Sequence, residues 1–429
     1  MLMLKTSDAG FEEKFAAFLR AKRENAVDVN DIVRGILNDV RENGDKAVFA
    51  YTKKFDRFDI DESNVRFSEK EIDDAVAACP KETLDALSLA ARRIRAFHEK
   101  QRPQDCEFID DSGVFCGWRY TPVTAAGLYV PGGTAAYPSS VLMNAIPAKV
   151  AGVERLVMVV PTPDGKVNPL VLAAAKEAGV DEIYRIGGAQ AIGALAYGTR
   201  SIPAVDMIVG PGNAFVACAK RQVFGIVGID MIAGPSEILV IADKSANPEW
   251  LAADLLSQAE HDVSAQSILI TDDEDLARKV CAEIDSQLKT LEREEIASKS
   301  WRDNGAVFLV DDVRRDAPAL ADRIAPEHLE LYVENPRALC DKLHHAGAFF
   351  LGAYTPEAVG DYVGGPNHVL PTARSARFSS GLGVPSFMKR STMLSCTAES
   401  VRKIGQAAVV LGKTEGLTAH AASVARRLK

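Results

Sequence analysis

The stretch Val123-Thr124-Ala125-Ala126-Gly127-Leu128-Tyr129-Val130 runs directly into Pro131-Gly132-Gly133-Thr134, so an apolar strand ends in a glycine turn. A helix is predicted from Ser140 to Val150. The next strand, Arg155 to Val160, is a continuous apolar run of the kind that parallel sheets bury. Strands and helices keep alternating up to Phe224, with glycine turns after the strands. This order predicts a doubly wound, mostly parallel sheet.

A second sheet-forming region follows, with helices between its strands. Its five apolar strands are expected at 238–241, 267–270, 307–310, 329–333 and 348–351. The expected fold class is therefore α/β, with two incomplete Rossmann-like doubly wound domains, an N-terminal helical arm and a C-terminal helical tail. We expect residues 1–24 to form the arm, 25–127 and 238–380 a first, discontinuous domain, 128–237 a second domain, and 381–429 the tail.

Composition narrows the class of protein. The 429 residues suffice for two or three domains, and 47% hydrophobic with 25% charged residues is typical of a soluble globular chain. A net charge of −9 without any basic block argues against nucleic-acid and membrane-surface partners. No apolar run is long enough to span a membrane or to act as a signal peptide. The seven scattered cysteines lack a C-x-x-C motif, which predicts reduced thiols in a cytoplasmic protein.

An amphipathic helix is predicted from Pro248 onward, and it ends in polar residues. Gln258 and His261 are three residues apart and share one helix face, whereas Glu260 and Asp262 point elsewhere. The pair can bind a cation. From this stretch alone, a histidine that merely complements the helix dipole is the stronger interpretation.

Three glycine turns follow predicted strands, where open α/β sheets bind ligands. They include Tyr129, Gln190 in Gly187-Gly188-Ala189-Gln190, and Asn213 in Gly210-Pro211-Gly212-Asn213. None matches G-x-G-x-x-G. A dinucleotide site and ordinary tight turns both remain open.

Further polar residues gather in the second half of the chain. Glu327 and His328 precede a strand, and such a pair can divide proton shuttling and water activation. Zinc accepts nitrogen and oxygen donors, so Gln258, His261, Asp361 and His420 could form a site, although glutamine is an unusual ligand. His98 stands among charged residues and is expected to be solvated. The remaining candidates are Ser236 in a turn, His368 in a glycine-rich loop, and Glu415 beside the last helix.

Seven motifs occur in an order that resembles the histidinol dehydrogenase family over almost the whole chain. No functional position departs from the family's pattern. The motifs are Gly127-Leu128-Tyr129-Val130-Pro131-Gly132-Gly133, Gly210-Pro211-Gly212-Asn213, Ala233-Gly234-Pro235-Ser236-Glu237, Gln258-Ala259-Glu260-His261-Asp262, Ala325-Pro326-Glu327-His328-Leu329, Gly365-Pro366-Asn367-His368-Val369-Leu370-Pro371-Thr372 and Glu415-Gly416-Leu417-Thr418-Ala419-His420.

The resemblance implies oxidation of L-histidinol to L-histidine through L-histidinaldehyde, with two NAD reduced, as the last step of histidine biosynthesis. It implies one Zn²⁺ per subunit, and NAD bound by the 128–237 domain. It also implies a homodimer whose C-terminal tail contributes to the partner's site. Glu327 and His328 would be the catalytic pair, and His328 would take the hydroxyl proton while Glu327 activates water.

The resemblance assigns the remaining roles by position. The implied zinc ligands are Gln258, His261, Asp361 and His420. The implied substrate contacts are Ser236, Gln258, His261, His328, Asp361, His368, Glu415 and His420. The implied NAD contacts are Tyr129, Gln190 and Asn213.

Three other hypotheses about the function stay open from the sequence. An aldehyde dehydrogenase would need a cysteine nucleophile on a loop that faces the cofactor, and no cysteine has such a setting. A zinc hydrolase that uses Glu327 as its base would act without NAD. A metal-binding protein without catalysis explains the histidines but not the Glu327-His328 pair.

Overall fold

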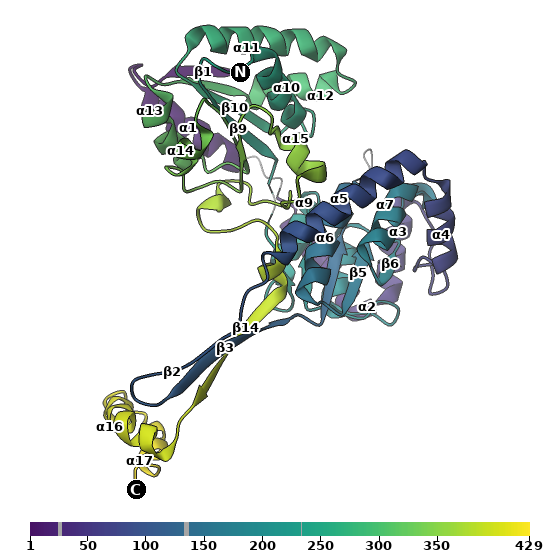
Figure 1. Cartoon of the computed structure of the whole chain (residues 1–429). Helices are drawn as coiled ribbons and strands as arrows, with labels where there is room; N and C mark the ends of the chain where they lie inside the picture. The colour runs from purple at the N-terminus through teal and green to yellow at the C-terminus, as the bar shows by residue number, and fades with distance from the viewer. Residues whose placement is uncertain (25–27, 133–136, 233) are drawn as a thin grey trace.

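The computed structural model describes residues 1–24, 28–132, 137–232 and 234–429. Gly133, Thr134 and Ala233 of the motifs quoted above lie outside the described residues. Figure 1 shows two α/β domains side by side, with a long ribbon of strands that carries the C-terminal helices away from both.

The larger domain is built on six parallel strands. Its central strands are buried throughout and mostly apolar, as expected for a sheet with both faces covered. In sheet order the strands are β1 (Leu2–Lys5), β11 (Ala306–Leu309), β10 (Gln266–Thr271), β9 (Glu237–Ala242), β12 (His328–Tyr332) and β13 (Ala348–Leu351). One face packs on α10 (Pro248–Ala259), α11 (Glu274–Gln287) and α12 (Glu294–Asn304). The other packs on α1 (Phe11–Glu24), α13 (Val313–Ile324) and α14 (Pro336–Cys340).

The smaller domain repeats this arrangement on five parallel strands. They are β6 (Glu182–Tyr184), β5 (Arg155–Val159), β4 (Ala125–Tyr129), β7 (Met207–Val209) and β8 (Gly228–Ile229). On one face lie α4 (Glu69–Ala78), α5 (Lys81–Glu99), α6 (Pro138–Ala151) and α7 (Pro169–Ala178). On the other lie α2 (Asn30–Asn43), α3 (Asp45–Asp56), α8 (Gly188–Tyr197) and α9 (Ala214–Val223). The expected class, two Rossmann-like doubly wound units, is confirmed.

The contacts correct two of the predicted boundaries. The N-terminal segment is not only a helical arm, because β1 pairs in parallel with β11 and α1 buries Phe11 and Phe15 against that sheet. Helices α2 to α5 do not belong with 238–380. Their apolar faces are buried on the five-stranded sheet, and Arg66 bridges to Tyr184 of β6. Amphipathic periodicity shows that a helix has a buried face, but not which sheet covers it.

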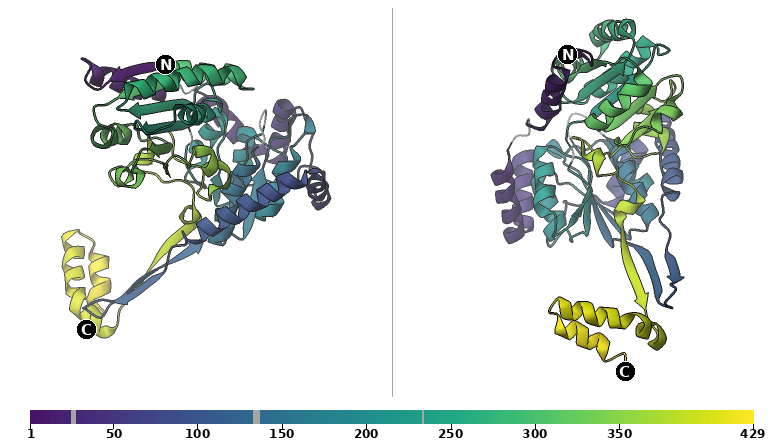
Figure 2. Two further views of the ribbon diagram at one scale, coloured as in Figure 1. Left: turned by 45° about the horizontal axis from the view of Figure 1, so that its top comes forward. Right: turned by 90° about the vertical axis from the view of Figure 1, so that its left-hand side faces the viewer.

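A ribbon of antiparallel strands, here called the stalk, leads to the C-terminal helices. It consists of β2 (Cys106–Ile109), β3 (Phe115–Pro122) and β14 (Met388–Ser395), in the order β14-β3-β2. At its end α16 (Ala398–Thr414) packs against α17 (Thr418–Ala425), and we call this pair the tail. The views in Figure 2 agree that stalk and tail stand clear of both domains. The stalk strands were not predicted.

The remaining elements are short. They are α15 (Glu357–Val359), the π-helix Gly360–Gly364, and 3-10 helices at Pro163–Gly165, Leu288–Thr290, Ser375–Arg377 and Val384–Phe387. All seven cysteines, each of which is described, are free thiols, as predicted. Among the helices of the described chain, none combines the length and apolarity that crossing a bilayer requires.

Candidate active site

A cavity of about 170 Å³ lies where the two domains meet. The larger domain contributes polar residues from the ends of strands and from loops. The smaller domain contributes the turn at Gly210 and the start of α6. Six of the predicted site residues line this one cavity: Ser236, His261, Glu327, His328, Asp361 and His368.

His328 is the first residue of β12, and its imidazole is almost fully buried. Its Nδ1 lies 3.0 Å from the carbonyl oxygen of Glu237, which can only accept, so Nδ1 carries the proton. Its Nε2 has no hydrogen-bond partner among the described residues. Burial lowers the pKa of His328 to about 3, so the ring is neutral near pH 7. Nε2 therefore holds a lone pair that can accept a proton from a ligand in the cavity.

Glu327 is held immediately beside it. One of its carboxylate oxygens, Oε2, accepts the backbone N–H of Glu237 at 2.9 Å and lies 3.8 Å from Nδ1 of His328. Ala325, two residues earlier, has φ +47°, a left-handed conformation that ends α13. This bend turns the chain so that both Glu327 and His328 reach the cavity.

Asp361 lies in the π-helix, a local widening that often accompanies functional sites. Its Oδ1 is 3.9 Å from Nε2 of His328 and 4.0 Å from Nδ1 of His368. Burial raises the pKa of the Asp361 carboxyl to about 7. Ligand-type atoms of His328, Glu357 and Asp361 all lie within 4.8 Å of one another, so this carboxylate sits in a group able to hold a cation.

Gln258 and His261 come from the end of α10, as predicted. The Gln258 amide nitrogen lies 3.2 Å from Nδ1 of His261, so the two side chains share one helix face. Gln258 is completely buried, yet its Oε1 has no hydrogen-bond partner in the described structure. An unpaired buried amide oxygen costs free energy unless something binds it. A zinc ion bound by this oxygen, His261 and Asp361 fits that observation.

His368 is fixed by both ring nitrogens. Its Nδ1 lies 3.1 Å from the backbone oxygen of Asp361, and its Nε2 lies 3.3 Å from the Ser140 hydroxyl. The preceding residue, Asn367, contacts Nε2 of His98 at 3.4 Å and donates to the Met143 carbonyl oxygen. The prediction that His98 is solvated is wrong, because its side chain is completely buried and supports this loop.

The turn at Gly210 forms the smaller domain's wall of the cavity. Gly210 has φ +108°, and a Cβ there would lie 2.1 Å from the carbonyl oxygen of Tyr129, so only glycine fits. A buried ion pair clamps its peptide groups: Asp230 accepts the Gly210 N–H at 2.8 Å, and Lys220 donates to the Gly210 carbonyl at 2.9 Å. Lys220 and Asp230 also contact each other directly.

We expect Lys220→Met to destabilise the protein by about 3–5 kcal/mol, because Asp230 would be left as a buried charge without its cation. Urea unfolding monitored by circular dichroism measures the loss. The double variant Lys220→Met/Asp230→Leu is the control and should recover much of the stability, since it buries no charge. Equal stability of wild type and Lys220→Met would contradict the proposed clamp.

The three predicted NAD-contact residues lie around the same turns. The Tyr129 hydroxyl accepts the Gly188 N–H at 3.1 Å, and burial raises the pKa of Tyr129 to about 12. Gln190 is buried in the first turn of α8, and its Oε1 has no partner within the described chain. Asn213 caps α9 by accepting two backbone N–H groups. Two helix N-termini beside glycine turns suit a pyrophosphate.

Glu415 and His420 are not brought to the cavity by their own chain. Both are exposed and belong to the tail, Glu415 at the end of α16 and His420 in α17. Figure 1 shows this tail at the far end of the stalk. Within one chain the site therefore lacks two of its predicted members.

Comparison with known proteins identifies the family. A family model described as histidinol dehydrogenase matches residues 19–428. The chain belongs to the histidinol dehydrogenase family. It is 64% identical to histidinol dehydrogenase from Rhodospirillum rubrum over 427 residues, which cover 100% of this chain and 98% of that protein. The Ruegeria pomeroyi protein of the same name is 63% identical over 99% of this chain and 98% of its own. A crystal structure of histidinol dehydrogenase from Elizabethkingia anophelis matches with a TM-score of 0.95 and 38% identity, over 100% of this chain and 98% of that one.

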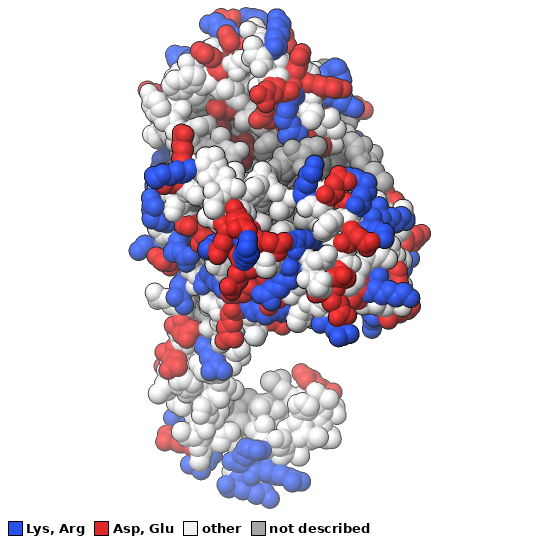
Figure 3. Space-filling view, turned by 90° about the vertical axis from the view of Figure 1, so that its right-hand side faces the viewer, with Lys and Arg blue, Asp and Glu red and all other residues white. Residues whose placement is uncertain are grey.

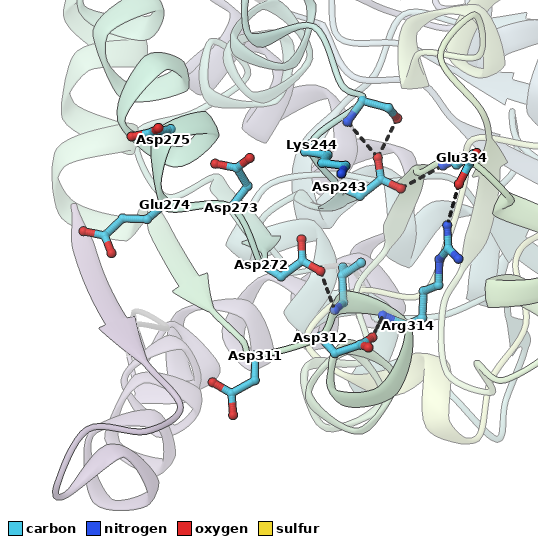
Figure 4. A pocket seen from close by; sticks show the side chains of 12 residues that line it. Asp243, Lys244, Asp272, Asp273, Glu274, Asp275, Asp311, Asp312, Arg314 and Glu334 are labelled. Carbon is cyan, nitrogen blue, oxygen red and sulfur yellow. Dashed lines mark hydrogen bonds and ion pairs between the residues drawn. The ribbon is translucent and has the colours of Figure 1, made fainter.

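As a histidinol dehydrogenase family member, the chain is an NAD-dependent oxidoreductase of histidine biosynthesis. A second, larger cavity of about 800 Å³ lies beyond the carboxyl ends of the six-stranded sheet, where such sheets usually bind dinucleotides. Figure 4 shows that carboxylates dominate its lining. The acidic residues are Asp243, Asp272, Asp273, Glu274, Asp275, Asp311, Asp312 and Glu334. Their charge repels a pyrophosphate, which favours the glycine turns of the smaller domain as the dinucleotide site.

Sequence motifs of the histidinol dehydrogenase family did not point to several residues of this site. Glu357 is buried, and its Oε1 lies 3.3 Å from Nδ1 of His328. It stands four residues before Asp361, so helical spacing could have placed the two on one face. No sequence signal links Ser140, Lys220 and Asp230 to the cavity, because they reach it only through the packing of the two domains.

Proposed function

We propose that this chain catalyses the zinc-dependent oxidation of L-histidinol to L-histidine through L-histidinaldehyde, reducing two NAD per substrate. The observation that carries the proposal is the neutral, buried His328, whose unpartnered Nε2 faces the cavity beside Asp361. A base in this position suits removal of a proton from an alcohol. Family membership supplies the substrate that has such an alcohol.

The residues around the cavity support a division of labour. In the first oxidation Nε2 of His328 accepts the hydroxyl proton while the carbinol hydrogen leaves as hydride to NAD. The carboxylate of Glu327 then takes a proton from the water that adds to the aldehyde. After His328 has released its first proton to solvent, Nε2 accepts a hydroxyl proton of the hydrate while a hydride leaves to the second NAD. This leaves the carboxylic acid of histidine, which ionises to the carboxylate.

Orientation comes from the ends of α10 and the π-helix. The proposed zinc ligands of this chain are Gln258, His261 and Asp361, with His420 as the fourth. Zinc, when bound, would hold the imidazole and amino nitrogens of histidinol and so fix its hydroxyl group. The unpartnered, buried Oε1 of Gln258 favours a set that includes this residue over the His328, Glu357 and Asp361 group, which would leave that oxygen unpaired. Ser236 and His368 would contact the substrate from the cavity wall.

One assay tests the reaction. Purified protein with L-histidinol and excess NAD should form two NADH for each histidinol consumed. Chelation should abolish this activity, and added zinc should restore it, whereas added magnesium should not. Formation of a single NADH would contradict the four-electron reaction. Turnover without NAD would instead favour a zinc hydrolase.

We also propose that the protein is a homodimer in which Glu415 and His420 complete the partner's site. The tail supports this because it carries exposed apolar residues; Leu411, for example, is 61% exposed. Figure 3 shows broad uncharged surface on the stalk and tail, whereas charged side chains cover most of the body. Two helices of this length cannot bury enough surface to be stable alone, so the tail needs another surface to pack on.

Mixing two inactive variants tests the exchange. We expect His261→Ala and His420→Ala each to be inactive, and their mixture, after unfolding and refolding together, to regain about one quarter of wild-type activity. In a mixed dimer one site would combine an intact body with an intact tail, and the other would carry both defects. A mixture that stays inactive would show that each tail serves its own chain. Refolded wild type alone is the control for yield.

A further inference from the structure

Three segments bring the proposed zinc ligands and the catalytic pair to the cavity. Helix α10 carries Gln258 and His261, β12 begins with His328, and the segment from α15 into the π-helix carries Asp361. Within the described chain, no backbone–backbone hydrogen bond joins α10 to α15. Side-chain contacts therefore help to set their relative position.

Glu330 lies at the centre of these contacts. It follows His328 by two residues in β12, so both side chains leave the same face of the strand. Glu330 is only 4% exposed, because it lies between Val240 and Phe350 in the middle of the sheet. A buried carboxyl is costly in such a place unless it is hydrogen-bonded.

Glu330 makes hydrogen bonds to both other segments. Its Oε1 accepts the backbone N–H of Glu357, the first residue of α15, at 2.6 Å. Its carboxyl group also bonds the carboxyl of Asp254 in α10. Asp254 precedes Gln258 by four residues and so lies one helical turn away on the same face. Glu357 in turn stands one turn before Asp361 and contacts His328.

Two carboxyl groups can bond each other only when one of them carries a proton. Burial raises the pKa of Asp254 to about 6 and that of Glu330 well above its ordinary value, which agrees with a shared proton. The pair adds little to stability, because a well-packed apolar pair of the same volume generally serves the fold at least as well. The pair instead contributes geometry, because hydrogen bonds are directional. They fix the distance and angle between α10, β12 and α15, whereas apolar contacts do not.

We propose that the Asp254–Glu330 carboxyl pair is a positioning link that holds the ligand-bearing segments of the zinc site in register. The inference rests on the zinc site proposed above. Neither residue would touch zinc or substrate. Both act through the residues one turn or two positions away: Gln258, His328 and Asp361.

The test compares metal affinity with stability. Glu330→Met removes both hydrogen bonds but keeps the volume, and it should weaken zinc binding by about 10- to 100-fold in a chelator competition, the loss typical of residues that orient metal ligands. The visible spectrum of bound Co²⁺ should change as well, because the ligand geometry changes. Glu330→Gln should bind nearly as wild type, since its amide can accept from Glu357 and donate to Asp254.

Asp243→Leu is the matched control. Asp243 is a similarly buried carboxylate at the other end of the sheet, and it accepts the N–H of Glu334 at 2.9 Å. This variant should lose stability in urea without losing zinc affinity. A merely structural role of Glu330 predicts the same behaviour for Glu330→Met, so wild-type zinc affinity in Glu330→Met would overturn the link. So would equal losses in Glu330→Met and Glu330→Gln. If wild type itself bound neither zinc nor Co²⁺, the proposed zinc site would fail, and the link with it.

Discussion

Replacement of His328 by alanine is expected to lower kcat by about 100- to 10,000-fold, the usual contribution of a general base, while zinc content stays near that of wild type. The reason is local. Nε2 of His328 has no partner within the described chain and lines the cavity, whereas Gln258, His261 and Asp361 are on other segments and keep their places. Steady-state NADH formation and zinc analysis of the same sample measure both quantities.

His328→Asn provides a matched comparison. Its shorter amide can still donate to the Glu237 carbonyl oxygen, so it preserves the contact that Nδ1 makes but lacks Nε2. If the base is Nε2, both variants lose turnover to a similar extent. A parallel loss of zinc in either variant would mean that His328 is a ligand, as its proximity to Glu357 and Asp361 also permits.

Replacement of His261 by alanine is expected to remove zinc from the purified protein and to abolish turnover. The remaining donors of this chain, Gln258 and Asp361, offer only oxygen atoms, whereas zinc prefers sites with nitrogen or sulfur ligands. Zinc affinity should fall by more than the about 10- to 100-fold that loss of a supporting residue causes. Metal analysis after dialysis, followed by zinc titration, measures the loss.

The control for this variant is His344→Ala. His344 is exposed, and the Asp322 carboxylate accepts its backbone N–H, which alanine retains. It should bind zinc as wild type does. Full zinc content in His261→Ala would rule out His261 as a ligand and would leave Gln258 without a reason for its unpaired oxygen.

The sequence predicted the parts of the fold that repeat a local pattern. The runs at Arg155 and Ile238 are strands because apolar residues follow one another without interruption, and both are buried in parallel sheets. The stalk strand Met388–Ser395 was missed, since most of its residues are exposed and its pattern carries no hydrophobic signal. Strand β1 was missed because four residues at a chain end give too short a pattern.

The candidate site was predictable where its residues are close together in the sequence. Spacing alone placed Gln258 with His261, and adjacency placed Glu327 with His328. Both pairs face one cavity or adjoin it. The contact between Glu330 and Asp254 could not be predicted. A glutamate in a strand and an aspartate in an amphipathic helix are usually exposed, and only the structure shows how far these two are buried. Such contacts arise from the packing of distant segments, which no local pattern encodes.

The stalk makes the proposed enzyme sensitive to how many copies of it are present. With the exchange proposed above, a lone chain folds its two domains but holds only three of four metal ligands, so it stays inert until it meets a second chain. Specific activity should then fall on dilution below the dimer's dissociation constant, and zinc should protect against that fall, because a ligand that binds only the paired state stabilises it by mass action. A newly made chain would thus become active only after it dimerises. In a cell that makes very little of the protein, most chains would be inactive monomers.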